Sequence, residues 1–427
     1  MFLRRSTRRS AASLALSLAL ALAVAGCGSV TPSAAPTQAA TPPPPTTGPV
    51  PTIAPSSRPA AEVFAEIRAA VEAIRGLQPT ASVDPVTIDE VQLRTNLEAE
   101  FDATYTPAQL KDIEELLAAL GLIPGHSSLR TLTLDLQAGQ VAGYYSPVKD
   151  ELFVVNRTGR LGPVDEATYA HEFTHQLQDQ RFDLDALGID VADQSDRSLG
   201  RLALVEGDAT SVQSTWMTTN LDSAELGELL AAALDPVAMA ALNNAPAYLR
   251  DTALFGYQDG LAFVGRLLAN GGYAAVDAAF ADPPDSTEQV LHPEKYLTRE
   301  QPIEVGLPAR VPDALGAGWA EVGRDTLGEL ILRIWLTEGG VPGPQARTAS
   351  AGWGGDRLAL YRGTDGKTAV LVRTMWDTPL DAEEFKNAAQ AAVTKLLPGG
   401  LVEWELGSTT VDILSAELVS QGVVLGN

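Results

Sequence analysis

One short stretch of this sequence requires a helix in the interior of the fold. His171, Glu172 and His175 lie within the largely apolar run 167–177. Because an α-helix has 3.6 residues per turn, side chains four positions apart project from the same face, one above the other. The apolar neighbours predict that this helix belongs to the core. A fold that contains this segment must therefore accommodate two imidazoles and a carboxylate inside it.

The spacing of the two histidines suits two nitrogen ligands on one zinc ion. Glu172 follows His171 directly, so its carboxylate would flank the metal, in the place of a general base that takes a proton from water. The chain has only 4 histidines, so two of them around a glutamate is an improbable coincidence. The alternative is a surface helix with two incidental histidines, and the apolar neighbours argue against it.

A catalytic zinc needs a third protein ligand and an open position. Glu206 is the candidate, because it lies on a second predicted helix among apolar residues. A lone buried carboxylate is unfavourable, and zinc would be its partner. The alternative is a Glu206 that pairs with Arg201 or faces outward. Asp208, two residues further on, could orient a ligand histidine, as carboxylates often do.

The pair His171-Glu172-x-x-His175 and Glu206-Gly207-x-Ala209 resembles the gluzincin branch of the zinc peptidases, which has the thermolysin-like arrangement. The resemblance is close over 129–215 and weaker beyond, where the chain is similar to bacterial lipoprotein-type metallopeptidases. It implies Zn²⁺ as the cofactor and a two-helix site behind a small sheet.

The same resemblance implies that the edge strand just upstream binds an extended peptide. The segment 140–145 is in the right place for that strand, with Gly143 and Tyr144 as the expected substrate-binding residues.

A peptidase also needs a group that stabilises the oxyanion. His292 is the best candidate by residue type and is our second predicted catalytic residue beside Glu172. Tyr296 and Tyr257 would lie behind it. The alternative is a loop or packing role, since His292 directly precedes a proline.

The pattern of apolar and turn residues predicts an α+β fold. A zincin-like metallopeptidase domain over 60–301 would combine a small sheet with active-site helices, and a smaller α+β C-terminal part would follow over 302–427. Helices are expected over 60–77, 107–120, 163–180, 197–216, 236–243, 254–268, 273–280, 327–336 and 381–397. Strands are expected over 131–136, 140–145 and 151–155, as an antiparallel meander, and over 358–361, 369–374, 402–406 and 410–414.

The first 59 residues predict export and anchoring. Residues 1–27 have the basic start and short apolar run of an export signal, and they end at Cys27 in a sequence that resembles the lipobox of bacterial lipoproteins. Cys27 is thus the expected lipidation site; the alternative is a signal peptide that is cut elsewhere. It is the only cysteine, which excludes internal disulfides. Residues 28–59 are rich in Pro, Ala and Thr, as in a disordered tether.

The formal net charge of −24 argues against nucleic acid as a partner. The expected partners are a peptide or protein substrate and, through the lipid, a bacterial membrane. The sequence therefore predicts an extracytoplasmic, lipid-anchored zinc peptidase. One alternative is a lipid-anchored binding or scaffold protein with a zincin-like fold and no catalysis. Another is a zincin-like hydrolase that acts on something other than protein.

Overall fold

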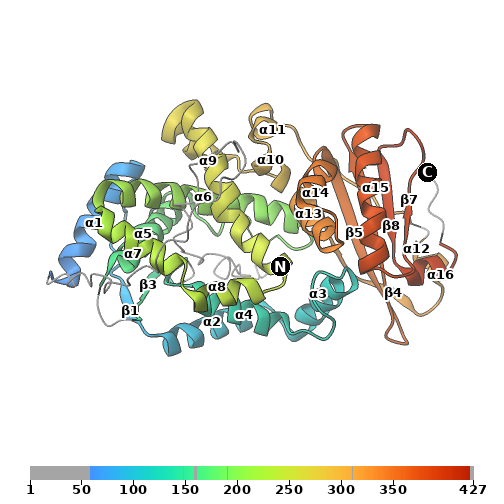
Figure 1. Ribbon diagram of the computed structural model, residues 1–427, viewed down its shortest axis with the longest axis horizontal. Helices are drawn as coiled ribbons and strands as arrows, with labels where there is room; N and C mark the ends of the chain where they lie inside the picture. The colour runs from blue at the N-terminus through green and yellow to red at the C-terminus, as the bar shows by residue number, and fades with distance from the viewer. Residues whose placement is uncertain (1–57, 148, 158–160, 190, 310, 424–427) are drawn as a thin grey trace, which may run out of the picture.

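The computed structural model of the chain describes residues 58–423, apart from 148, 158–160, 190 and 310 and the side chains of 237 and 238. Cys27, the predicted signal peptide and the predicted tether up to residue 57 lie outside the described residues. A helical body with a small sheet occupies one end of the molecule, and a larger sheet occupies the other (Figure 1). The predicted α+β class is confirmed. No helix within the described ranges has both the length and the apolar content to cross a bilayer.

The body is built mainly from helices. They are α1 (Ala60–Arg75), α2 (Glu90–Thr104), α3 (Pro107–Ala119), α4 (Leu129–Gln140), α5 (Pro163–Phe182), α6 (Ser195–Asn220), α7 (Ser223–Ala233), α8 (Pro236–Asn244), α9 (Ala247–Ala281), α10 (Thr287–Leu291) and α11 (Pro293–Thr298). The break that the sequence predicts near residue 271 is present, since Gly271 and Gly272 have non-helical backbone angles inside α9. The long helices α6 and α9 pack against each other through the centre of the body.

The small sheet contains β1 (Val86–Ile88), β2 (Gly143–Ser146) and β3 (Glu151–Val155) in the order β1-β3-β2. Strand β2 is antiparallel to β3, with Tyr144 opposite Phe153, and β1 is parallel to β3. Side chains alternate along β3: Leu152 and Val154 join the core beside α1 and α5, whereas Phe153 and Val155 join a core with residues of α2 and α4. Helices therefore cover both faces, and β2 forms one edge.

The strand predicted over 131–136 is wrong, because these residues belong to α4. Ser128 caps this helix, and its side chain accepts a hydrogen bond from the backbone N–H of Thr131 at 3.3 Å. Leucines at every second position indicated a strand, but buried Leu129 and Leu136 are also seven apart, on one helical face. The predicted meander is a β2–β3 hairpin joined by β1 from further upstream.

The C-terminal sheet is antiparallel throughout, in the order β4-β5-β6-β8-β7. Its strands are β4 (Trp319–Asp325), β5 (Trp353–Gly363), β6 (Thr368–Trp376), β7 (Leu401–Glu403) and β8 (Thr410–Leu414), and its helices are α12 (Val311–Leu315), α13 (Gly328–Glu338), α14 (Gly343–Ser350), α15 (Pro379–Leu396) and α16 (Ala416–Ser420). The strands predicted over 358–361, 369–374 and 410–414 are confirmed, whereas the strand predicted over 402–406 is wrong beyond Glu403, where β7 ends. Strand β4 was not predicted.

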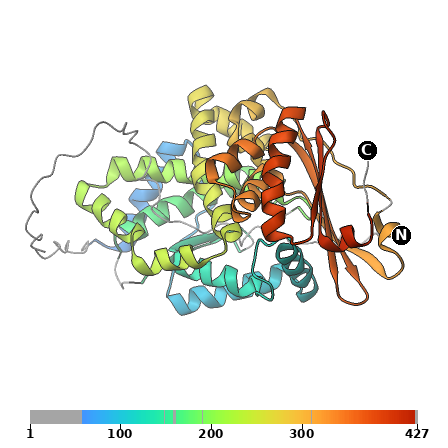
Figure 2. The ribbon, with the colours of Figure 1, turned by 45° about the vertical axis from the view of Figure 1, so that its right-hand side comes forward.

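Both faces of this sheet are also covered. Leu358 and Leu360 of β5 pack into the large core that contains α13, α14 and α15, and Ala359 and Tyr361 pack into a smaller core with α12 and α16. Helix α15 lies on the side of the sheet that faces the body (Figure 2). The large core continues without a break into α6 and α9. The domain boundary at 301/302 stays a prediction.

Candidate metal centre

Helix α5 carries the two histidines and is buried along most of its length. Gly162 precedes it, Pro163 is its first residue, and the Asp165 side chain accepts a hydrogen bond from the backbone N–H of Gly162 at 2.8 Å. Every residue from 167 to 178 is buried. The helix packs against the small sheet and against α1, α6 and α7. The predicted core helix is confirmed, and it brings both imidazoles onto one interior face.

Helix α6 brings Glu206 to that face because it can approach α9 closely. A Cβ atom on Gly207 would overlap with the backbone carbonyl of Gly260, and one on Gly260 would overlap with that of Ala203. Gly256 leaves room in the same way, since its Cβ would lie 3.2 Å from Cγ of Glu206. The glycine that follows Glu206 in the sequence therefore has a structural role, which is to let α6 and α9 meet beside the ligand.

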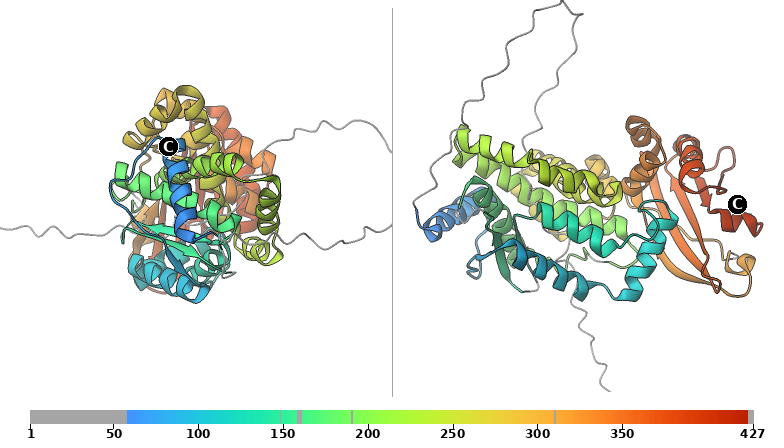
Figure 3. Two further views of the ribbon diagram at one scale, coloured as in Figure 1. Left: turned by 90° about the vertical axis from the view of Figure 1, so that its left-hand side faces the viewer. Right: turned by 60° about the horizontal axis from the view of Figure 1, so that its bottom comes forward.

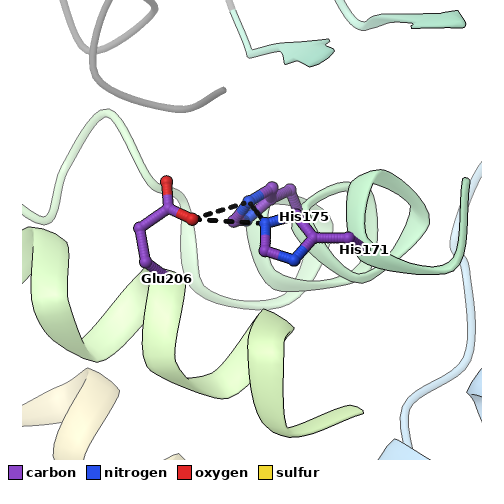
Figure 4. A group of neighbouring side chains, drawn as sticks. All are labelled: His171, His175 and Glu206. Carbon is purple, nitrogen blue, oxygen red and sulfur yellow. Dashed lines mark hydrogen bonds and ion pairs between the residues drawn. The ribbon is translucent and has the colours of Figure 1, made fainter. Parts of the chain in front are cut away.

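The ligand atoms of His171, His175 and Glu206 meet at one point (Figure 4). The two Nε2 atoms are 3.0 Å apart, and Oε2 of Glu206 lies 3.2 Å from Nε2 of His171 and 3.6 Å from Nε2 of His175. Metal–nitrogen bonds of about 2.0–2.1 Å in tetrahedral geometry would separate the ligand atoms by about 3.3 Å. The three distances match that spacing.

The hydrogen bonds of His175 define which of its nitrogens faces this point. Gln178 donates from Nε2 to the Val205 carbonyl at 3.0 Å and to Asp208 Oδ2 at 2.9 Å, so its Oε1 faces His175. That oxygen lies 2.9 Å from Nδ1 of His175. Because the amide oxygen only accepts, Nδ1 carries a proton and Nε2 is the nitrogen left to bind a metal. This is the tautomer that a metal ligand requires.

Burial and the neighbouring charges shift the pKa values of His175 and Glu206 in opposite directions. Burial alone would lower the pKa of His175, but the carboxylate of Glu206 raises it to about 9. Burial would likewise raise the pKa of Glu206, yet the two histidines lower it to about 2. For His171, burial lowers the pKa. Without a metal, the cluster thus favours an ionised Glu206 beside a protonated His175. A zinc ion would take the place of that proton, since zinc binds carboxylate oxygen and imidazole nitrogen.

A fourth atom supports a metal at this place. Oε1 of Glu206 is buried and has no hydrogen-bond partner among the residues that the structure describes. Leaving a buried carboxylate oxygen unsatisfied is unfavourable, and coordination to a cation would relieve it. His171, His175 and Glu206 could therefore hold a metal ion, and two imidazole nitrogens with one carboxylate are suitable ligands for zinc.

Glu172 lies beside this cluster, and a backbone group of strand β2 holds its carboxylate. Its Oε2 accepts a hydrogen bond from the backbone N–H of Tyr145 in β2 at 2.9 Å. Burial raises its pKa to about 8. Within the described part of the chain, its Oε1 is buried and has no hydrogen-bond partner. One carboxylate oxygen is thus fixed and the other is free to accept a proton.

Of the two residues predicted to bind substrate, Gly143 lies next to Glu172 and Tyr144 does not face it. A Cβ on Gly143 would lie 2.7 Å from Cγ2 of Thr168 and 3.6 Å from Cγ of Glu172, so only glycine lets β2 pack this tightly on α5. The Tyr144 side chain points away into the core, where it stacks on Phe153 with ring centroids 4.6 Å apart.

The structure places His292 in a different environment from that of the metal ligands. It lies between α10 and α11, and its Nε2 is 3.1 Å from Oε1 of Glu329 on α13. This hydrogen bond raises the pKa of His292. Among the described residues, its ion pairs are with Glu294 and Glu329 and not with Glu172 or Glu206, and its catalytic role stays a prediction. Tyr257 instead stacks on His171, with centroids 5.8 Å apart.

The sequence did not predict three residues near the site. They are Gln178, which contacts His175, Tyr257, which stacks on His171, and Arg75, which bonds to Asp208. Gln178 could have been found, because it lies three residues after His175 on the same helical face. Asp208 does not contact a ligand histidine directly; it bonds to Gln178 and to Arg75. Arg75 is far away in the sequence, so no local pattern could connect it to the site.

A second group of acidic residues has a different explanation. Oxygen atoms of Glu288, Glu300 and Asp377 also lie close together. However, Nζ of Lys295 lies among them, at 2.7 Å from Glu288 and Glu300 and 2.6 Å from Asp377. The ammonium group already occupies the place between the three carboxylates, so this cluster offers no comparable metal site.

Residues 314–411 match the family described as a domain of unknown function (DUF8575). The match covers most of the C-terminal sheet with α13, α14 and α15, and it includes none of the candidate metal ligands. Comparison with curated proteins and with solved structures gives no match.

Proposed function

We propose that this protein is a zinc-dependent peptidase, lipid-anchored through Cys27 on the outer side of a bacterial membrane. One observation carries the enzymatic part of the proposal. Three buried ligand atoms converge at metal-binding distances, and the carboxylate of Glu172 lies beside them with one free oxygen. A purely structural metal site would have no use for that free carboxylate. A bound zinc ion would polarise the scissile carbonyl and activate water at neutral pH.

The residues of the chain itself would perform the proton transfers. Oε1 of Glu172 would accept the proton of the attacking water and then deliver it to the leaving amine. The Tyr145 N–H would keep the carboxylate aimed during both steps, since it holds Oε2 at 2.9 Å. Tyr257 would hold the imidazole ring of His171 in place by stacking on it.

The edge of β2 that faces away from β3 supports a peptide as the substrate, although all four residues of the strand are buried. Because the Val155 N–H donates to the Ala142 carbonyl at 2.8 Å, the backbone groups of Gly143 and Tyr145 face away from β3. An extended chain can add to such an edge by backbone hydrogen bonds. Gly143 would offer its backbone groups there, directly beside Glu172. The ligand and base side chains are at most 1% exposed, so a covering segment must move before a peptide reaches them.

The test is zinc content and casein hydrolysis by the purified full chain, beside the Glu172→Gln variant. We expect about one zinc per chain in both proteins, and a loss of activity of at least about 10²-fold in the variant. Glutamine keeps an oxygen for the Tyr145 N–H, so the fold should not change. A wild type without zinc would contradict the proposal. Zinc without hydrolysis of any peptide would favour a binding protein or a hydrolase of another substrate.

The anchor is tested separately with Cys27→Ser. In the bacterial cell, the wild type should label with radioactive palmitate and sediment with membranes, and the variant should do neither. A variant that still sediments with membranes would argue against lipid on Cys27 as the anchor.

A further inference from the structure

Helix α1 carries an arginine that is completely enclosed by the protein. The Arg75 side chain is 0% exposed, although it ends a helix at the outer end of the molecule (Figure 3, left). Its Nε donates to Asp208 at 2.9 Å, and its Nη2 donates to Asp277 at 2.7 Å. The guanidinium also lies 4.7 Å from the ring centre of Tyr273. A charge is buried at this depth only when its partners compensate for lost hydration.

Asp208 connects this arginine to helix α5. It lies on α6, two residues after Glu206, and its Oδ2 accepts from both Arg75 and Gln178, each at 2.9 Å. Gln178 in turn accepts from Nδ1 of His175 at 2.9 Å. An unbroken series of hydrogen bonds therefore joins Arg75 to His175.

Each member of the series fixes the next one. Arg75 neutralises Asp208, which would otherwise be a buried unpaired charge. Asp208 and the Val205 carbonyl accept both N–H groups of Gln178, so only its oxygen can face His175. That oxygen holds the proton on Nδ1 and fixes the orientation of the ring. Partners of this kind around a metal ligand typically change metal affinity by about 10–100-fold.

We propose that Arg75 and Gln178 are positioning residues for His175, so that the docking of α1 contributes to the affinity of the site for its metal. This inference rests on the proposed zinc site. It assigns α1, which has no ligand of its own, to the metal centre. Helix α1 is the first helix of the described residues, so the contact links that helix to the site.

The competing explanation is that Arg75 only stabilises the fold. Asp277→Asn separates the two explanations, because Asp277 bonds Arg75 but not Gln178. Arg373→Met is the control for the loss of an arginine, since it removes a paired arginine, held by Asp412 at 2.7 Å, in the C-terminal sheet.

The experiment measures the zinc dissociation constant of the full chain by competition with a chromophoric chelator, with folding followed by circular dichroism. We expect Gln178→Met to weaken binding by about 10–100-fold and Arg75→Met by about 10-fold. Because both act through one series, the double variant should bind no more weakly than Gln178→Met alone. Asp277→Asn and Arg373→Met should bind as the wild type does.

If the Arg75→Met variant does not fold, Arg75→Lys takes its place in the same measurement. Lysine keeps the charge but lacks the planar fork that reaches two carboxylates, so we expect a smaller loss of affinity in the same direction. Wild-type affinity in the folded arginine variant, or a fully additive double variant, would overturn the inference while the zinc site stands. A wild type that binds no zinc would instead remove the proposed function itself.

Discussion

The backbone N–H of Tyr145 donates to Oε2 of Glu172 at 2.9 Å, which ties the proposed general base to the edge of the small sheet. The position of this carboxylate therefore depends on how closely β2 packs on α5. Gly143 sets that distance, because its missing side chain leaves room for Thr168 and for the backbone of Phe153.

Gly143→Ala should separate the strand from the helix. The new Cβ would lie 2.7 Å from Cγ2 of Thr168 and 2.8 Å from the Phe153 carbonyl oxygen, closer than atoms can pack. We expect a destabilisation of about 1–3 kcal/mol and a lower kcat with zinc retained, measured by urea unfolding and casein hydrolysis. Gly227→Ala in α7 is the control, since its Cβ would meet nothing within 4 Å. Full activity in Gly143→Ala would contradict the proposed place of β2.

Gly207→Ala should act on the metal rather than on the base. Its Cβ would overlap with the Gly260 carbonyl, so α6 must move away from α9 and carry Glu206 with it. We expect weaker zinc binding together with a loss of stability of about 1–3 kcal/mol or more. Gly265→Ala, on the same helix as Gly260 but with open space around it, should leave zinc binding unchanged and should not lower stability, since alanine is favoured over glycine inside a helix. Zinc titration and urea unfolding of both variants decide the point.

The candidate metal ligands could be predicted from the sequence because their geometry is local. Two histidines four apart share a helical face whatever the rest of the fold does, and the apolar neighbours of Glu206 indicated its burial. The strands around 358–361 and 369–374 were predictable for a related reason. They are covered on both faces, so their residues are almost continuously apolar.

Other features depend on contacts that no local pattern contains. Arg75 meets Asp208 across 133 positions of the chain, and Tyr257 meets His171 through the packing of α9. Helix α4 was predicted as a strand because its leucines fit both periods, and the buried face decides between them. Strand β4 is half-exposed throughout, so it lacks an apolar run.

Zinc should stabilise the folded chain by mass action. A ligand that binds only the folded state adds about 2.7 kcal/mol when its free concentration is 100 times the dissociation constant. The melting temperature should therefore rise with added zinc and fall with a chelator. Glu206→Gln keeps the shape of the side chain but removes the charge, so its melting temperature should respond far less. An equal response in both proteins would mean that zinc binds elsewhere.

Asp196, at the start of α6 and away from the metal site, should make the stability of the fold depend on pH. It accepts hydrogen bonds from the backbone N–H of Thr287 at 2.9 Å and from the Thr287 hydroxyl, yet burial raises its pKa to about 8. The folded chain thus holds this proton more tightly than the unfolded chain does. The resulting stabilisation is complete below the usual aspartate pKa of about 4 and is lost as the pH rises to about 8.

Asp196→Asn tests this dependence. The amide oxygen can accept from the same two donors without ionising, so the variant lacks the pH-dependent term. The unfolding free energy of the variant relative to the wild type should increase between about pH 4 and pH 8, by an amount on the order of a few kcal/mol. Urea unfolding at several pH values measures the difference. A constant difference over this range would show that Asp196 ionises in the folded chain as it does in water.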